Sequence, residues 1–75
     1  MRIFPNPSST VFNVAVENTI GPYRYRVFNS IGQLIRESEE NKSNFTVDVS
    51  NLETGIYFFS ISGNDIQEVQ KVIKL

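Results

Sequence analysis

The chain has 75 residues, a formal net charge of -1, and neither cysteine nor histidine. Without them it lacks disulfides and the thiolate and imidazole ligands of zinc and copper sites, which leaves only carboxylate sites for hard cations. We expect no metal site and no cofactor. Its seven Lys and Arg residues are scattered, and nucleic acid and anionic membrane are therefore not expected as partners.

The pattern of apolar residues predicts an all-β domain. No apolar run approaches the ~20 residues of a membrane-spanning helix. Apolar and polar residues alternate, and no stretch sustains a helical stripe. About six to seven short strands separated by turn signals favour a small immunoglobulin-like antiparallel β-sandwich. We expect one domain over residues 1–75, in which 1–10 form a linker junction and the entry to the first strand.

The first predicted strand follows the opening stretch "MRIFPNPSST". Pro5 and Pro7 have fixed φ and restrict the residue before each of them. We therefore expect that the residues before the first predicted strand pair with no other strand and mark the junction with a linker. In "TVFNVAVEN" the more apolar face consists of Phe12, Val14 and Val16, and we expect these side chains to face the core.

The next two predicted strands run from Tyr23 to Phe28 and from Gln33 to Glu37. Gly32, in the turn between them, supplies the positive φ that a tight hairpin requires. Arg24 and Arg26 then share an outward face, because successive side chains alternate across a strand.

The second half of the chain continues in the same way. The polar run Ser38 to Asn44 predicts a loop, and the alternation in "FTVDVSNL" predicts a half-buried strand after it. In "SNLETGIYFF" a polar turn ends at Gly55 and leads into large apolar residues, which favours a central strand over Gly55 to Ser62. "SGND" has the composition of a hairpin turn. The terminal "IQEVQKVIKL" fits a strand or a short helix, and we predict a strand.

The carboxylates offer little basis for catalysis. There is no histidine to act as general base, and although two carboxylates can in principle hydrolyse a glycosidic bond, the best remaining acids lie in the predicted polar loop and near a predicted hairpin, where solvated charges are usual. These acids are Glu39, Glu40, Asp65 and Glu68. We therefore predict a protein that is not an enzyme.

Aromatic and cationic side chains on one predicted strand suggest an alternative. Tyr23, Tyr25 and Phe28, beside Arg24 and Arg26, can form a binding face for sugar or protein if they line one surface. Ordinary cross-strand packing explains the same residues. A non-catalytic adhesive or carbohydrate-binding β-sandwich module thus remains an alternative function.

Four short stretches, taken in order, carry a family resemblance. They are "FPNPSSTVFNV", "VFNSIGQLI", "VDVSNLETGIYFFSI" and the terminal "QKVIKL". Together they resemble the C-terminal sorting domain of the type IX secretion system over nearly the whole chain. Each stretch is short, and their specificity comes from occurring in register within 75 residues.

The resemblance assigns candidate recognition residues to each stretch. The residues that match the family patterns are Pro5, Asn6 and Pro7 in the opening motif, Gly32 and Leu34 in the central turn, Leu52, Gly55, Ile56 and Tyr57 in the third motif, and Lys71 and Lys74 in the basic tail. The chain departs from the family in ending on Leu75 rather than on a basic or polar residue.

The resemblance also implies a function, partners and a location. Such a domain is the address on a larger N-terminal cargo, which passes through the periplasm and then crosses the outer membrane by way of the type IX translocon and its shuttle proteins. A cell-surface sortase then removes the domain, and the cargo reaches the cell surface or the medium.

Several motif residues have structural interpretations as well. Gly32 and Gly55 suit turns, and Leu52 is expected to fold back into the core. Lys71 and Lys74 fit two roles: protection of an edge strand against aggregation, and recognition by a partner. We hypothesise that a partner captures the terminal strand through main-chain hydrogen bonds along its edge.

Overall fold

The computed structural model describes residues 1–17 and 21–75, and its regular structure is entirely β. The strands are β1 (Arg2–Phe4), β2 (Val11–Ala15), β3 (Tyr23–Asn29), β4 (Leu34–Glu40), β5 (Asn44–Asp48), β6 (Gly55–Ser62) and β7 (Gln67–Lys74). None of the described residues belongs to a helix long and apolar enough to cross a membrane.

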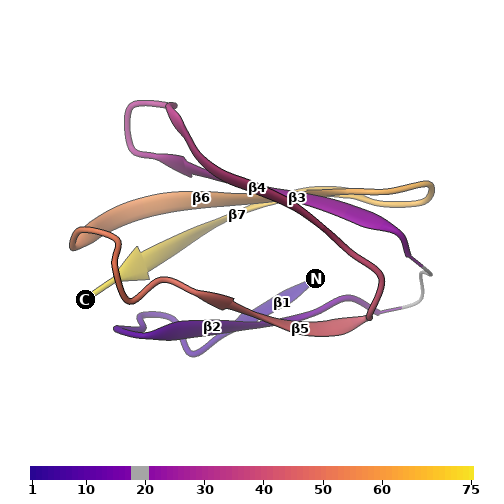
Figure 1. The fold of residues 1–75 in the computed structure, drawn as a ribbon, viewed down its shortest axis with the longest axis horizontal. Helices are drawn as coiled ribbons and strands as arrows, with labels where there is room; N and C mark the ends of the chain where they lie inside the picture. The colour runs from indigo at the N-terminus through magenta and orange to yellow at the C-terminus, as the bar shows by residue number, and fades with distance from the viewer. Residues whose placement is uncertain (18–20) are drawn as a thin grey trace.

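The strands form two antiparallel sheets packed face to face, as Figure 1 shows. One sheet has the order β1-β2-β5 and the other the order β4-β3-β6-β7. In a constant-type immunoglobulin domain the fourth strand lies beside the fifth, whereas here β4 pairs with β3. The predicted β-sandwich is confirmed, with β6 between β3 and β7 as a central strand.

The core lies between the sheets and is built by alternation along each strand. Phe12, Val14 and Val16 are buried, as their pattern predicts. The ring of Tyr25 stacks between the rings of Phe45 and Phe59, at centroid distances of 5.6 and 5.3 Å. Stacked aromatic pairs add to the free energy of burial, so this contact ties β3 and β6 to β5 in the facing sheet.

Three predictions about strands and turns are confirmed. β6 has the predicted bounds, Gly55–Ser62, and the terminal run forms the predicted strand β7. Gly32 has a φ of 86° in the turn between β3 and β4, where Gly32 N–H donates to the Asn29 carbonyl at 3.0 Å. A residue with a side chain rarely adopts this φ, which explains glycine at the position.

The predicted loop over Ser38 to Asn44 is wrong in its first part. β4 continues to Glu40, where Glu40 lies opposite Tyr23. The stretch is polar because β4 is an edge strand, so its side chains are largely solvated. Only residues 41–43 remain as the connection to β5.

The expectation that the chain stays unpaired before Pro5 is also wrong. Arg2–Phe4 form β1, which pairs with β2, and Ile3 is buried in the core. The prolines lie in the connection between these strands, where they interrupt pairing without preventing it earlier in the chain. The opening residues therefore belong to the sandwich.

Candidate functional site

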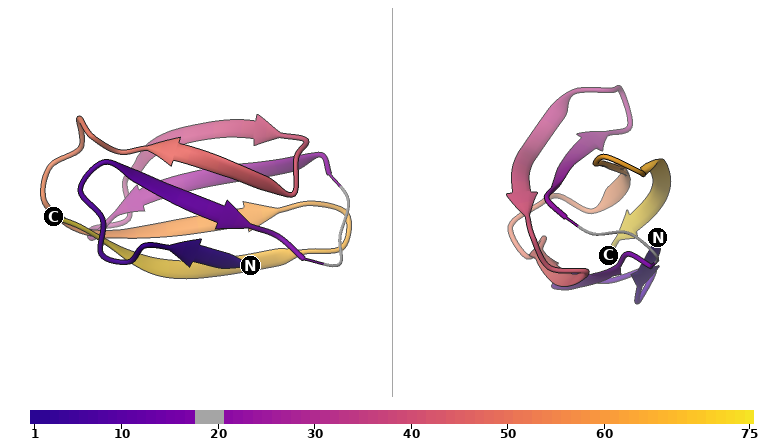
Figure 2. Two further views of the ribbon diagram at one scale, coloured as in Figure 1. Left: turned by 90° about the horizontal axis from the view of Figure 1, so that it is seen from below. Right: turned by 90° about the vertical axis from the view of Figure 1, so that its right-hand side faces the viewer.

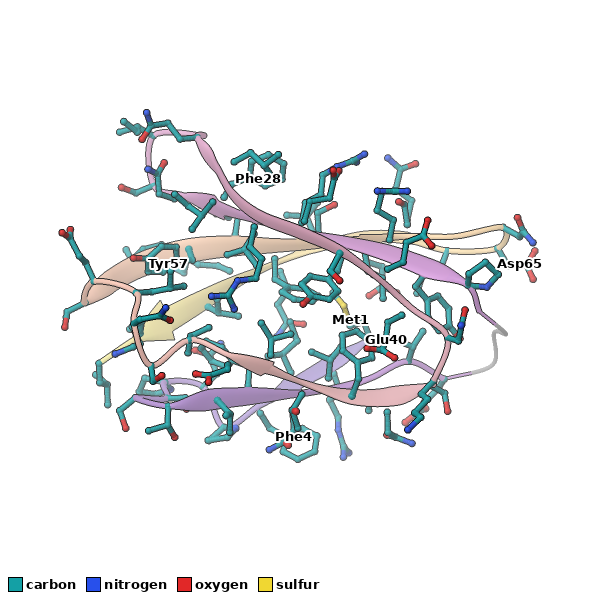
Figure 3. All side chains as sticks on the ribbon, in the orientation of Figure 1. Met1, Phe4, Phe28, Glu40, Tyr57 and Asp65 are labelled. Atoms are coloured by element: carbon teal, nitrogen blue, oxygen red, sulfur yellow. The ribbon has the colours of Figure 1, made fainter. Side chains whose placement is uncertain are left out.

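All four motifs lie at one end of the sandwich. Figure 2 shows the β1–β2 connection, the β3–β4 turn, the β5–β6 connection and the C-terminus together at the left of its first view. The strand register agrees, because Gly55 pairs with Lys74 and Asn29 pairs with Tyr57. We call this the motif end; the β6–β7 turn lies at the opposite end, where Figure 3 labels Asp65.

The third motif builds a tyrosine corner at the start of β6. The Tyr57 hydroxyl donates to the Glu53 carbonyl at 2.7 Å, while its ring is buried between the sheets (Figure 3). Leu52 packs against the core, and Gly55 has a φ of 156° that side chains rarely adopt. This arrangement fixes a chain crossing between two sheets, as in immunoglobulin domains. The motif's polar turn is therefore architectural, as its structural interpretation predicts.

We predict that Tyr57→Phe lowers the free energy of unfolding by about 1 kcal/mol, because it removes one hydrogen bond and keeps the ring. For a domain of this size that corresponds to a fall in Tm of roughly 4–8 °C. Thermal unfolding followed by circular dichroism measures the change. An unchanged Tm would contradict a stabilising role for the Tyr57–Glu53 bond.

The Asp48 carboxylate accepts a hydrogen bond at the start of the same connection between β5 and β6. The Ser50 amide donates to Asp48 Oδ1 at 2.9 Å, and the Arg36 side chain reaches from β4 to the Asp48 carbonyl. The hydrogen bonds from Ser50, helped by the charge of Arg36, hold the pKa of the Asp48 carboxyl below its usual value. Arg36 thereby links the two sheets along the side where β4 and β5 have free edges.

The opening motif is bonded to the terminal strand. The Asn6 side chain donates from Nδ2 to the Lys71 carbonyl at 3.1 Å, and its Oδ1 accepts from the Ile73 amide at 3.0 Å. A side-chain amide thus takes the place of a strand residue beside the outer edge of β7. The Pro5 and Pro7 residues flank it, each after a cis peptide bond.

Ser8 continues this contact with its own backbone. Its amide donates to the Ile73 carbonyl at 3.0 Å, and its carbonyl accepts from the Leu75 amide at 2.8 Å. We call Asn6 and Ser8 together the clamp. They bond the outward carbonyls of Lys71 and Ile73 and the outward amides of Ile73 and Leu75. Sequence reasoning missed the clamp, because it joins residues 65 or more positions apart.

The two tail lysines face opposite sides of β7. Lys71 is exposed, whereas Lys74 is only 6% exposed. The stem of Lys74 borders a small apolar space beside Leu52, Tyr57 and Val72, and its Nζ donates to the Leu75 carbonyl at 2.8 Å. The inward position of Lys74 is compatible with edge protection, because an inward-pointing charged side chain on an edge strand also discourages pairing with another sheet. Both lysines therefore keep both interpretations.

Lys74→Met is expected to leave the free energy of unfolding within about 0.5 kcal/mol of the parent, since methionine keeps a long unbranched stem in the same space. Chemical denaturation with urea checks this. A loss above about 1 kcal/mol would show that the ammonium group itself stabilises the fold.

The central turn and the tyrosine corner border a shared surface hollow of about 390 Å³. Ile31, Ile35 and Ile56 contribute exposed apolar side chains to it. Leu34, the motif residue that follows the turn, is exposed and lies opposite Phe28 of the neighbouring strand β3. The motif end is therefore the part of the surface where two motifs present apolar side chains together.

The aromatic binding face suggested for β3 does not form. Tyr23 and Tyr25 are 1% and 8% exposed, and they lie on the core side of the sheet while Phe28 lies outside it (Figure 3). The reason is alternation: Arg24 and Arg26 require solvent, which turns the intervening tyrosines inward. The prediction that both arginines point outward is confirmed.

Both arginines are paired with acids of the neighbouring strand. Arg24 Nη2 lies 2.7 Å from Glu39 Oε1, and Arg26 Nε bonds Glu37. Among the other acids considered for catalysis, Glu68 lies 3.1 Å from the Met1 amine. Within residues 1–17 and 21–75, no three acidic side chains gather as ligands for a metal ion.

The fold and the gathered motifs define a small β-sandwich module whose distinguishing sequence features converge at one end. A family model described as the secretion system C-terminal sorting domain matches residues 2–75. The chain belongs to this family, the C-terminal sorting domains of type IX secretion, as its motifs indicated. Membership implies export to the cell surface or the extracellular space.

The chain is also similar to a larger protein. It is 31% identical over 64 residues to ulvan lyase NLR42 of Nonlabens ulvanivorans, an alignment that covers 84% of this chain and 12% of that protein. The chain thus spans about one eighth of its relative's length.

Proposed function

We propose that residues 1–75 act as a folded address on a larger N-terminal cargo. In this proposal the cargo crosses the periplasm, the translocon and its shuttle proteins recognise the domain, and a cell-surface sortase removes it. The domain itself performs no catalysis. The single observation that supports the proposal best is the convergence of all four family motifs at the motif end.

The motif residues divide the work in this proposal. Gly32, Leu52, Gly55 and Tyr57 shape the surface, Asn6 between its two prolines holds the terminal strand, and Lys71 and Leu34 are presented to the partner. Lys74 acts from inside, through its buried stem. The alternative adhesive or carbohydrate-binding function loses its basis, because Tyr23 and Tyr25 are buried.

Secretion of a fluorescent cargo tests the proposal. The cargo carries an N-terminal signal peptide and residues 1–75 at its C-terminus, and it is expressed in a host with a working type IX system and in a translocon-deficient sibling. We expect extracellular or surface fluorescence in the first host alone. Periplasmic retention in both hosts, with the domain folded, would refute the proposal.

A further inference from the structure

The outer face of the four-stranded sheet is divided into a polar half and an apolar half. Residues directly opposite one another in antiparallel strands lie on the same face. The polar half, away from the motif end, contains Arg24 and Arg26 with their acidic partners. Each of these charges is already paired within the domain, so this half offers little to a partner.

The apolar half lies at the motif end, across all four strands. The register places Leu34, Phe28, Phe58 and Lys71 in one row, and Ile56 opposite Ile73 in the next. We call these six residues the outer patch. Phe28 and Phe58 are partly buried, while Leu34, Ile56 and Ile73 are exposed by 51%, 42% and 36%. Contiguous exposed apolar side chains with a polar border are typical of a protein interaction site.

Lys71 is the charged member of the outer patch. Within the part of the chain that the structure describes, no carboxylate forms an ion pair with its ammonium group. The arginines of the polar half differ in this respect. A partner that complements the patch would therefore supply apolar side chains and one carboxylate opposite Lys71.

The clamp decides how a partner can approach the terminal strand. Strand addition needs the outward main-chain groups of an edge strand. Asn6 and Ser8 already bond the Lys71 carbonyl, both main-chain groups of Ile73 and the Leu75 amide. The side chains of Lys71 and Ile73 remain exposed on the outer face. The tail is thus open to contact through its side chains, while Asn6 and Ser8 cover its edge from the Lys71 carbonyl to the Leu75 amide.

We propose that the outer patch is the surface through which the secretion machinery binds the domain, by docking a folded surface of apolar side chains with an acidic group against Lys71. Asn6 acts as a positioning residue that holds the tail in the extended form this docking needs. The inference rests on the proposed sorting function and names the kind of partner surface involved.

Variants of exposed residues in β7 test the inference in the two-host secretion assay. Ile73→Glu places a charge in the patch, and Lys71→Glu reverses its cation. Val69→Glu is the matched control, because Val69 is 65% exposed on the same face of the same strand but lies opposite Ser60, in the polar half. Lys71→Arg keeps the charge.

We expect Ile73→Glu and Lys71→Glu to lower secretion about tenfold or more, as loss of a central interface contact does. Val69→Glu and Lys71→Arg should remain within about twofold of the parent, and all four should keep the parent's Tm within a few degrees because exposed substitutions change stability little. Normal secretion of folded Ile73→Glu would overturn the inference.

Two further results would also overturn it. If Asn6→Ala raises secretion while Ile73→Glu is tolerated, the partner adds a strand to the opened edge. If the purified domain sediments as a dimer that Ile73→Glu dissociates, the patch binds a second copy of the chain. Failure of the parent domain to direct secretion in either host would instead refute the sorting function itself, before any variant is compared.

Discussion

Replacing Phe59 by alanine is expected to lower the free energy of unfolding by about 3–5 kcal/mol, the range for removing a buried phenylalanine. Phe59 is 2% exposed on the central strand β6, and its ring stacks on Tyr25 at 5.3 Å. A domain of 75 residues has about 4–11 kcal/mol of stability in total. The substitution therefore removes a large share of it, and denaturation with urea measures the loss.

Phe58→Ala is the matched control for this prediction. Phe58 is the same residue type on the same strand, one position earlier, but it lies on the outer face and is only partly buried. We expect it to cost about 1 kcal/mol, since it leaves no cavity in the core. Equal losses for the two variants would contradict the assignment of Phe59 to the core.

Replacing Asn6 by alanine is expected to cost about 2 kcal/mol, because it removes two hydrogen bonds to the backbone of β7 at once. The effect should be local as well as global. The Ile73 amide loses its acceptor, and we expect its hydrogen exchange to accelerate about tenfold or more under native conditions. Urea denaturation and exchange measured by nuclear magnetic resonance provide the two readouts.

Asn13→Ala is the control for the loss of an asparagine side chain. Asn13 lies on β2, partly buried and opposite Phe4 and Thr46, so its side chain is not placed to bond β7 as that of Asn6 does. We expect a smaller loss of stability and no change at Ile73. If Asn6→Ala leaves Ile73 exchange unchanged, Asn6 does not hold the terminal strand.

Local patterns were sufficient to predict most of the strands. The switch from polar turn residues to "GIYFF" located β6, because glycine and the apolar run each have a strong structural preference there. The alternation of side chains along a strand also predicted correctly that Arg24 and Arg26 point outward. It failed for the end of β4, where an edge strand exposed to solvent has the composition of a loop.

The orientation of β7 could not be decided from its own sequence. Val69 and Ile73 alternate with Val72, so both faces contain apolar residues. Packing against the facing sheet selects Val72 and Lys74 as the buried pair, and a lysine can accept this position because its stem is apolar. The resemblance located the basic tail but gave no indication that its two lysines point in opposite directions.

The clamp was beyond prediction for a different reason. Its contacts join Asn6 and Ser8 to the other end of the chain, and no periodicity within either segment signals such a pairing. The opening and terminal motifs, separate in the sequence, are one unit in the structure. This unit accounts for an asparagine between two prolines, because a side chain with both a donor and an acceptor can imitate a strand backbone.

Amide hydrogen exchange in the unmodified domain tests this unit most directly. The Ile73 and Leu75 amides face the outer edge of β7 and are bonded by the clamp, whereas Val69 faces the same edge beyond its reach. We predict slow exchange at Ile73 and Leu75 and fast exchange at Val69. Exchange at Ile73 and Leu75 as fast as at Val69 would show that the opening motif does not hold the tail.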